Sequence, residues 1–430
     1  MQPTELPTYH TVGIGAGPAN LSLAALLPAA GLGPVALFDR QPGPAWHPAL
    51  LSPGVRMQTS WMKDLVSLVD PQHPLTFMNY LVTTGRLFAL LNAQFDTIPR
   101  LEYVRYLTWA ARRIEGIHYG TDVERITYTD DGFELFAGGR PIARAQHVSI
   151  GVGTRASRPA WMDGLPDTAL IADDLGWRID AMKAAEGALD APVAVVGGGQ
   201  TGLECVLKLL HAGFTDVRWL GRRQWFQTID DSPVANEFYR PAHGQFLQQL
   251  SRGTRRRLVV EQGPTGDALT PGALRVLYQS NYDRMLDLDR FPAVLYPGRD
   301  VVSVTADGDG DGGELVMRCE TPGGREEHRA RYVVVAVGRE ASPVPFDDDL
   351  AERVEYDDDG DMLIEPDYSL RWKGMNGHRI FVLNRARYSH GVPDANLTLL
   401  PVRAATVINA MAGRQVFNVI DDLCPVRWIA

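Results

Sequence analysis

The sequence predicts an α/β protein with two Rossmann-like dinucleotide-binding domains, the second inserted into the first, and a small helical region that binds a substrate. Two observations support this prediction. A strand, a glycine-rich turn, a helix and a second strand follow one another near the N-terminus, and the same order restarts in mid-chain. The chain also has 430 residues, which is too long for one ordinary hydrophobic core.

The first unit predicts a site for FAD. Its elements are a strand over residues 11–14, a helix over 21–27 and a strand over 35–38. Gly15 and Gly17 allow a tight turn that brings backbone N–H groups to a pyrophosphate at the start of the helix, beside Pro18. Asn20 stands where a third glycine is usual, and its short polar side chain tolerates the turn. Asp39 follows the second strand, where a carboxylate accepts hydrogen bonds from a ribose diol.

The stretch after this unit is predicted to complete the first part of the FAD domain. Residues 77–114 show helical periodicity, residues 123–136 alternate like a hairpin, and residues 147–151 read as a buried strand. We therefore expect the first part of this domain to cover residues 1–165.

The second unit predicts a site for NADPH. A strand over residues 193–196 leads into a glycine-rich turn, whose expected cofactor contacts are Gly197, Gly199, Gln200, Thr201 and Gly202. The following strand, over residues 217–220, is succeeded by Arg222 and Arg223 and has no acid at its end. Arginines there accommodate a 2′-phosphate, which a carboxylate would repel. The pair of sites thus indicates bound FAD and visiting NADPH.

The remaining segments give the expected domain order. The NADPH domain should cover residues 166–330, with a substrate-binding region at about 230–290. An apolar strand over 332–337 and a helix over 397–411 then belong to the second part of the FAD domain, residues 331–430.

Composition excludes several other classes of protein. The chain is 45% hydrophobic and 22% charged, with a net charge of −10, which argues against nucleic acid as a partner. Its three cysteines form no CxxC pair, and a reducing compartment is expected. The apolar stretch over residues 21–27 lacks a charged lead-in and is too short to span a bilayer. We expect a cytoplasmic protein without a membrane span.

No metal site is expected. The acidic, glycine-rich stretches at residues 307–313 and 357–361 lack the twelve-residue spacing of a calcium loop and are predicted to be hairpin turns. The histidines show no ligand spacing such as HxxxH.

Several stretches resemble one family throughout nearly the whole chain. They are WHP at 46–48, MQTSWMKDLV at 57–66, FMNYL at 77–81, RLEY at 100–103, DDSP at 230–233 followed by Asn236-Glu237, Asn281-Tyr282, Asn384 and SHG at 389–391. This set resembles the N-hydroxylating flavoprotein monooxygenases, which include lysine N6-, ornithine N5- and diamine N-monooxygenases. The lysine branch looks closest.

This resemblance implies a reaction. Such enzymes reduce FAD with NADPH, bind dioxygen as a flavin C4a-hydroperoxide, and pass one oxygen atom to the terminal primary amine of the substrate. L-Lysine heads the expected substrates, followed by ornithine, putrescine and cadaverine, and the product would serve siderophore or other hydroxamate biosynthesis. We also expect a homo-oligomer, either a dimer or a tetramer.

The resemblance also implies roles for single residues. Gln58 would lie beside the isoalloxazine ring, and Lys63 would face the substrate's carboxylate. Asn236 and Asn281 would contact the substrate, the latter also near the nicotinamide ribose. Thr398 stands where the family often has Ser near the flavin and substrate. The expected cofactor contacts further include Trp46, His47 and Asn384.

Departures from the family pattern leave alternatives open. The family's Ala-Thr-Gly-Tyr stretch reads Ala336-Val337-Gly338-Arg339 here, so a hydroxyl and an aromatic ring are lost. A Baeyer–Villiger or heteroatom-oxidising flavin monooxygenase uses the same cofactors, but its usual FxGxxxHxxx(W/Y) stretch would need a histidine at Ile142. A flavin-binding protein that has lost activity is the non-catalytic alternative.

Overall fold

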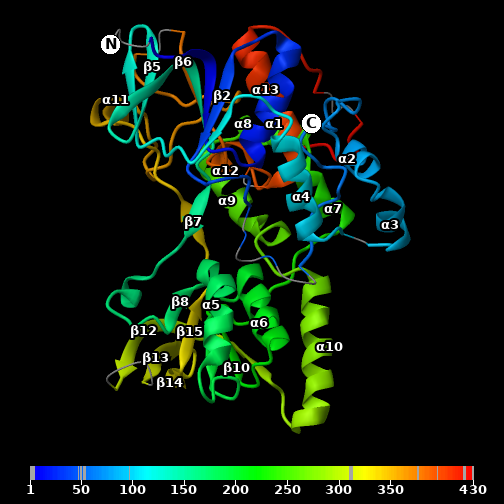
Figure 1. Cartoon of the computed structure of the whole chain (residues 1–430), viewed down its shortest axis with the longest axis vertical. Coiled ribbons are helices and arrows are strands. Elements are labelled where there is room, and N and C mark those ends of the chain that lie inside the picture. The colour runs from blue at the N-terminus through cyan, green and yellow to red at the C-terminus, as the bar shows by residue number, and fades with distance from the viewer. Residues whose placement is uncertain are drawn as a thin grey trace.

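The computed structural model describes residues 5–46, 48, 51, 55–95, 97–308, 313–374, 377–394, 396–419 and 423–428. Its two largest sheets, one mixed and one parallel, lie in the upper and lower halves of Figure 1. The chain passes between the halves through β7 (Thr154–Ala156) and β16 (Arg339–Ala341), which pair antiparallel. The predicted α/β class with two Rossmann-like domains is confirmed.

The upper sheet has the order β3-β2-β1-β6-β5-β4, with β17 beside β6. Its parallel strands are β1 (Thr8–Ile14), β2 (Val35–Asp39), β3 (Ile117–Tyr119), β6 (Arg140–Ile150) and β17 (Arg379–Val382). The predicted hairpin is present as β4 (Arg125–Thr129) and β5 (Gly132–Ala137), which pair antiparallel. Because the parallel strands end at one edge, this sheet presents a single nucleotide-binding edge.

Helices cover this sheet with apolar side chains. On one face lie α1 (Pro18–Leu26), α4 (Arg100–Ala111) and α13 (Leu400–Ala412), whose buried residues form one cluster with those of α2 (Phe77–Thr83). The short α3 (Leu87–Asn92) follows α2 and buries none of its residues. A second cluster on the opposite face includes side chains of β4, β5 and α11 (Asp348–Arg353).

The lower sheet is entirely parallel, in the order β11-β10-β9-β15-β8. Its strands are β8 (Ala169–Ile171), β9 (Val193–Val196), β10 (Val217–Gly221), β11 (Ala293–Pro297) and β15 (Tyr332–Val335). Strand β15 lies between β9 and β8, which corrects the boundary predicted at residue 331. The chain leaves this sheet only after β15, because an apolar run alone does not specify which sheet a strand joins.

Two layers cover the lower sheet. One contains α5 (Ala172–Ala184), α6 (Gln200–Ala212) and α10 (Pro271–Leu288). The other is an antiparallel sheet of β12 (Asp300–Asp307), β13 (Glu314–Thr321) and β14 (Gly324–Ala330). Strands β12 and β13 flank the predicted turn at 307–313, of which residues 309–312 lie outside the described part of the chain.

The region expected to bind a substrate is divided between the halves. The helices α7 (Pro233–Asn236), α8 (Pro241–Gln248) and α9 (Arg252–Glu261) precede α10 in the chain. Of these, α8 and α9 pack against α12 (Arg387–His390) of the upper half, whereas α10 packs against α6 of the lower half. The region therefore bridges both domains beside the space between them.

The acidic stretch at 357–361 forms the predicted hairpin turn. Tyr356 and Met362 form an antiparallel bridge, and the Asp357 backbone N–H donates to the Asp361 carbonyl at 2.9 Å. Arg252 of α9 lies 2.9 Å from Asp357, and Arg256 pairs with Asp361. These carboxylates thus hold α9 against the upper domain. No helix in the described part of the chain is long and apolar enough to cross a membrane.

Candidate active site

The first glycine turn has the geometry that a pyrophosphate requires. Gly15 has φ +89°, and a Cβ on it would lie 2.5 Å from the Gly151 carbonyl oxygen, so only glycine fits. Gly17 faces open space and begins α1, which has no side-chain cap. The first N–H groups of α1 are therefore available to an anion. The Asp39 carboxylate accepts from the Ala16 N–H at 2.7 Å, which places it beside this turn.

Asn20 lies behind the turn. Its amide donates to the Gly15 carbonyl at 2.7 Å, and its oxygen accepts from the Ser149 hydroxyl at 2.7 Å. These buried hydrogen bonds brace the turn and connect β1 to β6. Pro18 occupies the first turn of α1. A contact of either residue with a cofactor stays a prediction.

The second glycine turn repeats this design at α6. Gly197 has φ +129°, and a Cβ there would lie 2.1 Å from the Ala336 carbonyl oxygen. A Cβ on Gly202 would lie 2.1 Å from the Gly197 carbonyl oxygen, so the helix can approach the turn this closely only because residue 202 is glycine. Gly199 faces open space and starts α6 without a side-chain cap. Both fingerprint helices thus lack a side-chain cap, as do α4, α5 and α10, and what distinguishes them is the glycine turn that precedes each one.

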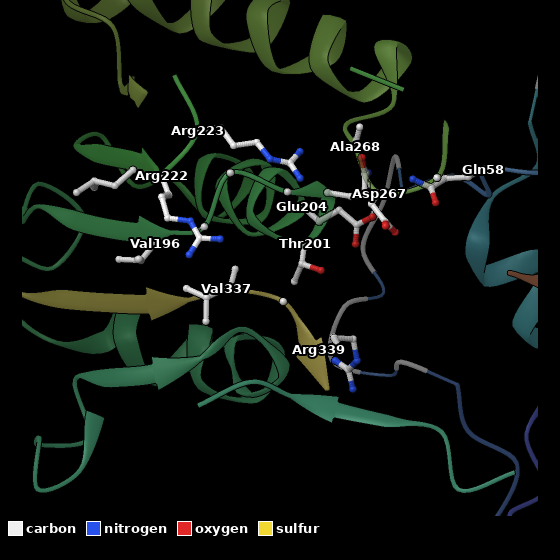
Figure 2. Close-up of a pocket in the computed structure, with 18 of the residues that line it drawn as sticks. Gln58, Val196, Thr201, Glu204, Arg222, Arg223, Asp267, Ala268, Val337 and Arg339 are labelled. Atoms are coloured by element: carbon white, nitrogen blue, oxygen red, sulfur yellow. Dashed lines mark hydrogen bonds between the residues drawn. The ribbon is translucent and has the colours of Figure 1, made fainter. Parts of the chain in front are cut away.

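A cleft of about 800 Å³ joins the two halves. It is lined by these residues predicted from the sequence: Trp46, Gln58, Gly197, Gly199, Gln200, Thr201, Arg222 and Arg223. In the view of Figure 2, Arg222 lies toward one end and Gln58 toward the other, with Glu204 and Asp267 between them. Gln58 is exposed and forms no hydrogen bond within the described ranges. The cleft thus runs from the second glycine turn to Trp46 and Gln58 of the first domain, whereas Gly15, Gly17 and Asp39 do not line it.

Arg222 and Arg223 supply positive charge at their end of the cleft. Both are exposed, and neither forms an ion pair within the part of the chain that the structure describes. Arg299 lines the same cleft, but its guanidinium pairs with Glu326 at 3.0 Å, which lowers the pKa of that carboxyl. The two unpaired arginines therefore fit a phosphate dianion.

A network that sequence reasoning missed crosses the cleft. Arg100 of α4 binds Glu204 of α6 through two hydrogen bonds of 2.8 and 2.7 Å. Gln200 donates to the same carboxylate at 3.1 Å and accepts from the Thr270 N–H at 2.9 Å. The network thus connects the FAD domain, the second fingerprint and the start of α10. In the sequence, the only sign of this network is Glu204, two residues after Gly202, and an acid in a helix does not by itself reveal its partner.

Lys63 is partly buried without a counter-ion. Its ammonium has no hydrogen bond or ion pair within the described ranges, and burial lowers its pKa below the ordinary lysine value. A desolvated, unpaired ammonium gains from an anionic partner. The residue is therefore suited to receive a carboxylate, but it is not among the residues that line the cleft, so its contact with a substrate stays a prediction.

Two predicted substrate contacts lie elsewhere. Asn281 is buried between α10 and β11, where its amide donates to the Ala293 carbonyl at 2.8 Å and its oxygen accepts from the Ala293 N–H at 2.9 Å. Asn236 is exposed, and its amide bonds the Asp231 and Ser232 carbonyls at 3.2 Å. Neither lines the cleft. Their expected roles stay predictions that this arrangement does not support.

Of the remaining predicted residues, Trp46 lines the cleft, whereas Thr398 and Asn384 do not. The Thr398 hydroxyl is buried and donates to Asn396 at 2.7 Å, and Asn396 itself lines the cleft. Asn384 has φ +64° and accepts from Arg403 at 2.6 Å. Trp46 stands at the cleft edge-on to Tyr103, with ring centroids 5.8 Å apart. His47 lies outside the described residues.

The residues that depart from the family pattern lie where the domains connect. Val337 lines the cleft with an exposed side chain. Arg339 on β16 donates to the Thr154 hydroxyl on β7 at 2.9 Å and pairs with Asp173 of α5 at 2.8 Å. Arg339 therefore links both connecting strands to the lower domain.

The chain as a whole is similar to known proteins in sequence and in fold. The family model described as L-lysine 6-monooxygenase/L-ornithine 5-monooxygenase matches residues 7–341. The L-lysine N6-monooxygenase of Escherichia coli is 29% identical over 425 residues, covering 97% of each chain. The putrescine N-hydroxylase of Acinetobacter baumannii is 26% identical, covering 96% of this chain and 91% of the relative. The FAD-bound cadaverine monooxygenase from the desferrioxamine pathway of Erwinia amylovora shares the fold, with a TM-score of 0.89 at 22% identity over 98% of this chain and 99% of its own.

Proposed function

Because the chain belongs to the L-lysine 6-monooxygenase/L-ornithine 5-monooxygenase family, we propose that it N-hydroxylates the terminal primary amine of a small aliphatic substrate. The reaction uses FAD, NADPH and dioxygen. The observation that carries this proposal is the cleft that runs from the unpaired Arg222 and Arg223, past the uncapped start of α6, to Trp46 and Gln58 of the first domain.

The chain's own residues hold the reactants. The turn at Gly15 and Gly17 would receive the FAD pyrophosphate, and Asp39 would receive its ribose. Arg222 and Arg223 would bind the 2′-phosphate of NADPH. Bound FAD supplies the redox chemistry that converts dioxygen into an oxygen donor. The protein's part is to orient the amine and to exclude water from it.

L-Lysine is the first expected substrate, followed by ornithine, cadaverine and putrescine. The reacting amine has to be neutral to act as a nucleophile, although free alkyl amines titrate near pH ~10. Lys63 would bind the carboxylate of an amino-acid substrate. The product would be an N-hydroxylated amine for a hydroxamate siderophore.

An amine panel tests both the reaction and the role of Lys63. Hydroxylamine formation, rather than NADPH loss, is measured for lysine, ornithine, cadaverine and putrescine. In Lys63→Ala, the KM for lysine is expected to rise by about 10- to 100-fold, because a charge-assisted contact is lost. The KM for cadaverine, which has no carboxylate, should remain unchanged and serves as the internal control.

Two results would contradict this reading. An equal rise in KM for lysine and cadaverine in Lys63→Ala would show that Lys63 stabilises the structure and does not bind a carboxylate. Ketone oxidation without any hydroxylamine would favour the Baeyer–Villiger alternative.

We further propose a homo-oligomer formed through α10, which lies along one edge of the molecule (Figure 1). Tyr278, Tyr282 and Leu286 are exposed and recur every fourth residue on one face. An antiparallel pair of α10 helices centred on Tyr282 would bury these side chains. The same two-fold axis would place Arg275 of one helix opposite Asp289 at the end of the other, since both stand seven residues from Tyr282.

Sedimentation of Tyr282→Asp tests this interface. The variant is expected to have a lower mass than the wild-type protein, because a buried charge disfavours association. Phe88→Asp on α3, which is also exposed, is the matched control and should keep the wild-type mass. Dissociation by Phe88→Asp alone would place the interface on α3 instead.

We propose a cytoplasmic location, where NADPH is regenerated and where the three buried cysteines would remain reduced. Fractionation of producing cells tests this location. Recovery outside the cytoplasm would contradict it.

A further inference from the structure

One carboxylate stands accessible in the part of the cleft near Gln58. The described residues that line the cleft include three acids, Glu204, Asp267 and Asp300. Glu204 is buried and forms an ion pair with Arg100. Asp300 lies at the end of the cleft near Arg222, because the backbone N–H of the preceding Arg299 donates to the Gly221 carbonyl. Asp267 differs from both, because its side chain is 53% exposed.

The position of Asp267 is determined by the surrounding hydrogen bonds. Its N–H donates to the Gly263 carbonyl at 2.9 Å, and the neighbouring Ala268 and Leu269 are buried. Three residues further, the Thr270 N–H donates to Gln200, which is itself bound to Glu204. The loop is therefore held against the second fingerprint, so its carboxylate is preorganised.

Only one oxygen of this carboxylate is engaged. Oδ2 pairs with Arg387 of α12, while Oδ1 has no hydrogen bond within the described part of the chain. Figure 2 shows Asp267 on the side of the cleft toward Gln58. Asp267 thus has one oxygen available where a substrate would approach the flavin.

Building on the proposed function, we propose that Asp267 binds the ammonium group of the amine substrate as it enters the cleft, before that group loses its proton to solvent and reacts as the neutral amine. A primary amine with a pKa of about 10 arrives charged at neutral pH. The same cleft is lined by Arg56, Arg222 and Arg223, which form no ion pair among the described residues and repel a cation. A carboxylate with a free oxygen offsets this repulsion and supplies a charge-assisted hydrogen bond.

This assignment separates two anchors for the substrate. Lys63 would bind the carboxylate, which only amino acids carry, whereas Asp267 would bind the amine that every substrate carries. The two residues therefore predict different specificity patterns when each is replaced. Lys63→Ala affects lysine and ornithine, while Asp267→Asn affects lysine and cadaverine alike.

The test compares Asp267→Asn with Arg387→Gln, which removes the same ion pair from its other side. Hydroxylamine formation from lysine and from cadaverine is measured, together with FAD content and flavin reduction by NADPH without amine. In Asp267→Asn, the KM for both amines is expected to rise by about 10- to 100-fold, with unchanged FAD content and flavin reduction. In Arg387→Gln, the KM should stay the same or fall, because Asp267 loses its competitor.

Two outcomes would overturn the assignment. An unchanged KM in Asp267→Asn excludes contact with the amine. Equal increases in both variants show that the ion pair only supports the loop. If the wild-type protein makes no hydroxylamine from any amine, the proposed function fails, and calorimetric binding of cadaverine to the wild type and Asp267→Asn still decides the role of Asp267.

Discussion

Replacing Arg100 with alanine is expected to lower kcat/KM for NADPH by about 100-fold or more and to reduce the thermal stability of the chain. Arg100 and Glu204 join the two domains through paired hydrogen bonds of 2.8 and 2.7 Å, and their side chains are only 12% and 5% exposed. Removal of one partner from a buried ion pair costs about 3–5 kcal/mol, because the other charge remains buried and unpaired. This loss destabilises the arrangement in which the two domains are docked and form the cleft.

The matched control is Arg86→Ala. Arg86 also binds a carboxylate through two hydrogen bonds, both 2.8 Å to Glu102, but this pair lies within one domain and Arg86 is 40% exposed. Its loss should leave the KM for NADPH unchanged. In contrast to the single variant, Arg100→Met combined with Glu204→Leu should recover much of the stability, because no unpaired charge remains.

Steady-state kinetics with NADPH, thermal unfolding and solution scattering measure these effects. Equal kinetic constants in Arg100→Ala and Arg86→Ala would show that the pair does not control the docking of the domains. A larger radius of gyration in Arg100→Ala, but not in Arg86→Ala, would support the proposal that this ion pair holds the two domains together.

Replacing Arg222 and Arg223 together with alanine is expected to remove the preference for NADPH over NADH. Both arginines line the cleft and lack an ion pair within the described ranges, so their charges are available to the 2′-phosphate. Hydrogen bonds to charged groups contribute about 1.5–3 kcal/mol each, which predicts a fall in kcat/KM for NADPH of about 100- to 10,000-fold. The value for NADH should change little.

Arg218→Ala is the control for this double variant. Arg218 lies on the same strand, β10, but it pairs with Asp216 at 2.8 Å and does not line the cleft. Arg218→Ala should leave the ratio of kcat/KM for NADPH to kcat/KM for NADH unchanged. Equal decreases with NADPH and NADH in the double variant would mean that the arginines support the fold rather than the phosphate.

Several features could be predicted from the sequence because their causes are local. A turn with φ +89° at Gly15 or φ +129° at Gly197 needs glycine, and the residues at the end of the next strand stand beside it. Asp39 and Arg222 are therefore found by counting along the chain. The turn at residues 357–361 was predictable for the same reason.

Other features could not be predicted because they depend on packing. Strand β15 reads as an apolar run in the sequence, and only its pairing with β8 and β9 assigns it to the lower sheet. The sequence motif pointed to Asn281, but α10 packs that side chain against β11. Asp267, which carried no motif, lines the cleft because the loop before α10 is held against the second fingerprint.

The sequence by itself determined the two fingerprints, the sites expected for FAD and NADPH and the resemblance to amine hydroxylases, because these depend on residues close together in the chain. Tertiary structure alone decided which side chains meet across the cleft. Arg100 and Glu204 are separated by 104 positions, and Asp267 and Arg387 by 120. Such pairs form only when the domains dock, since burial of their charges is favourable only with the partner in place.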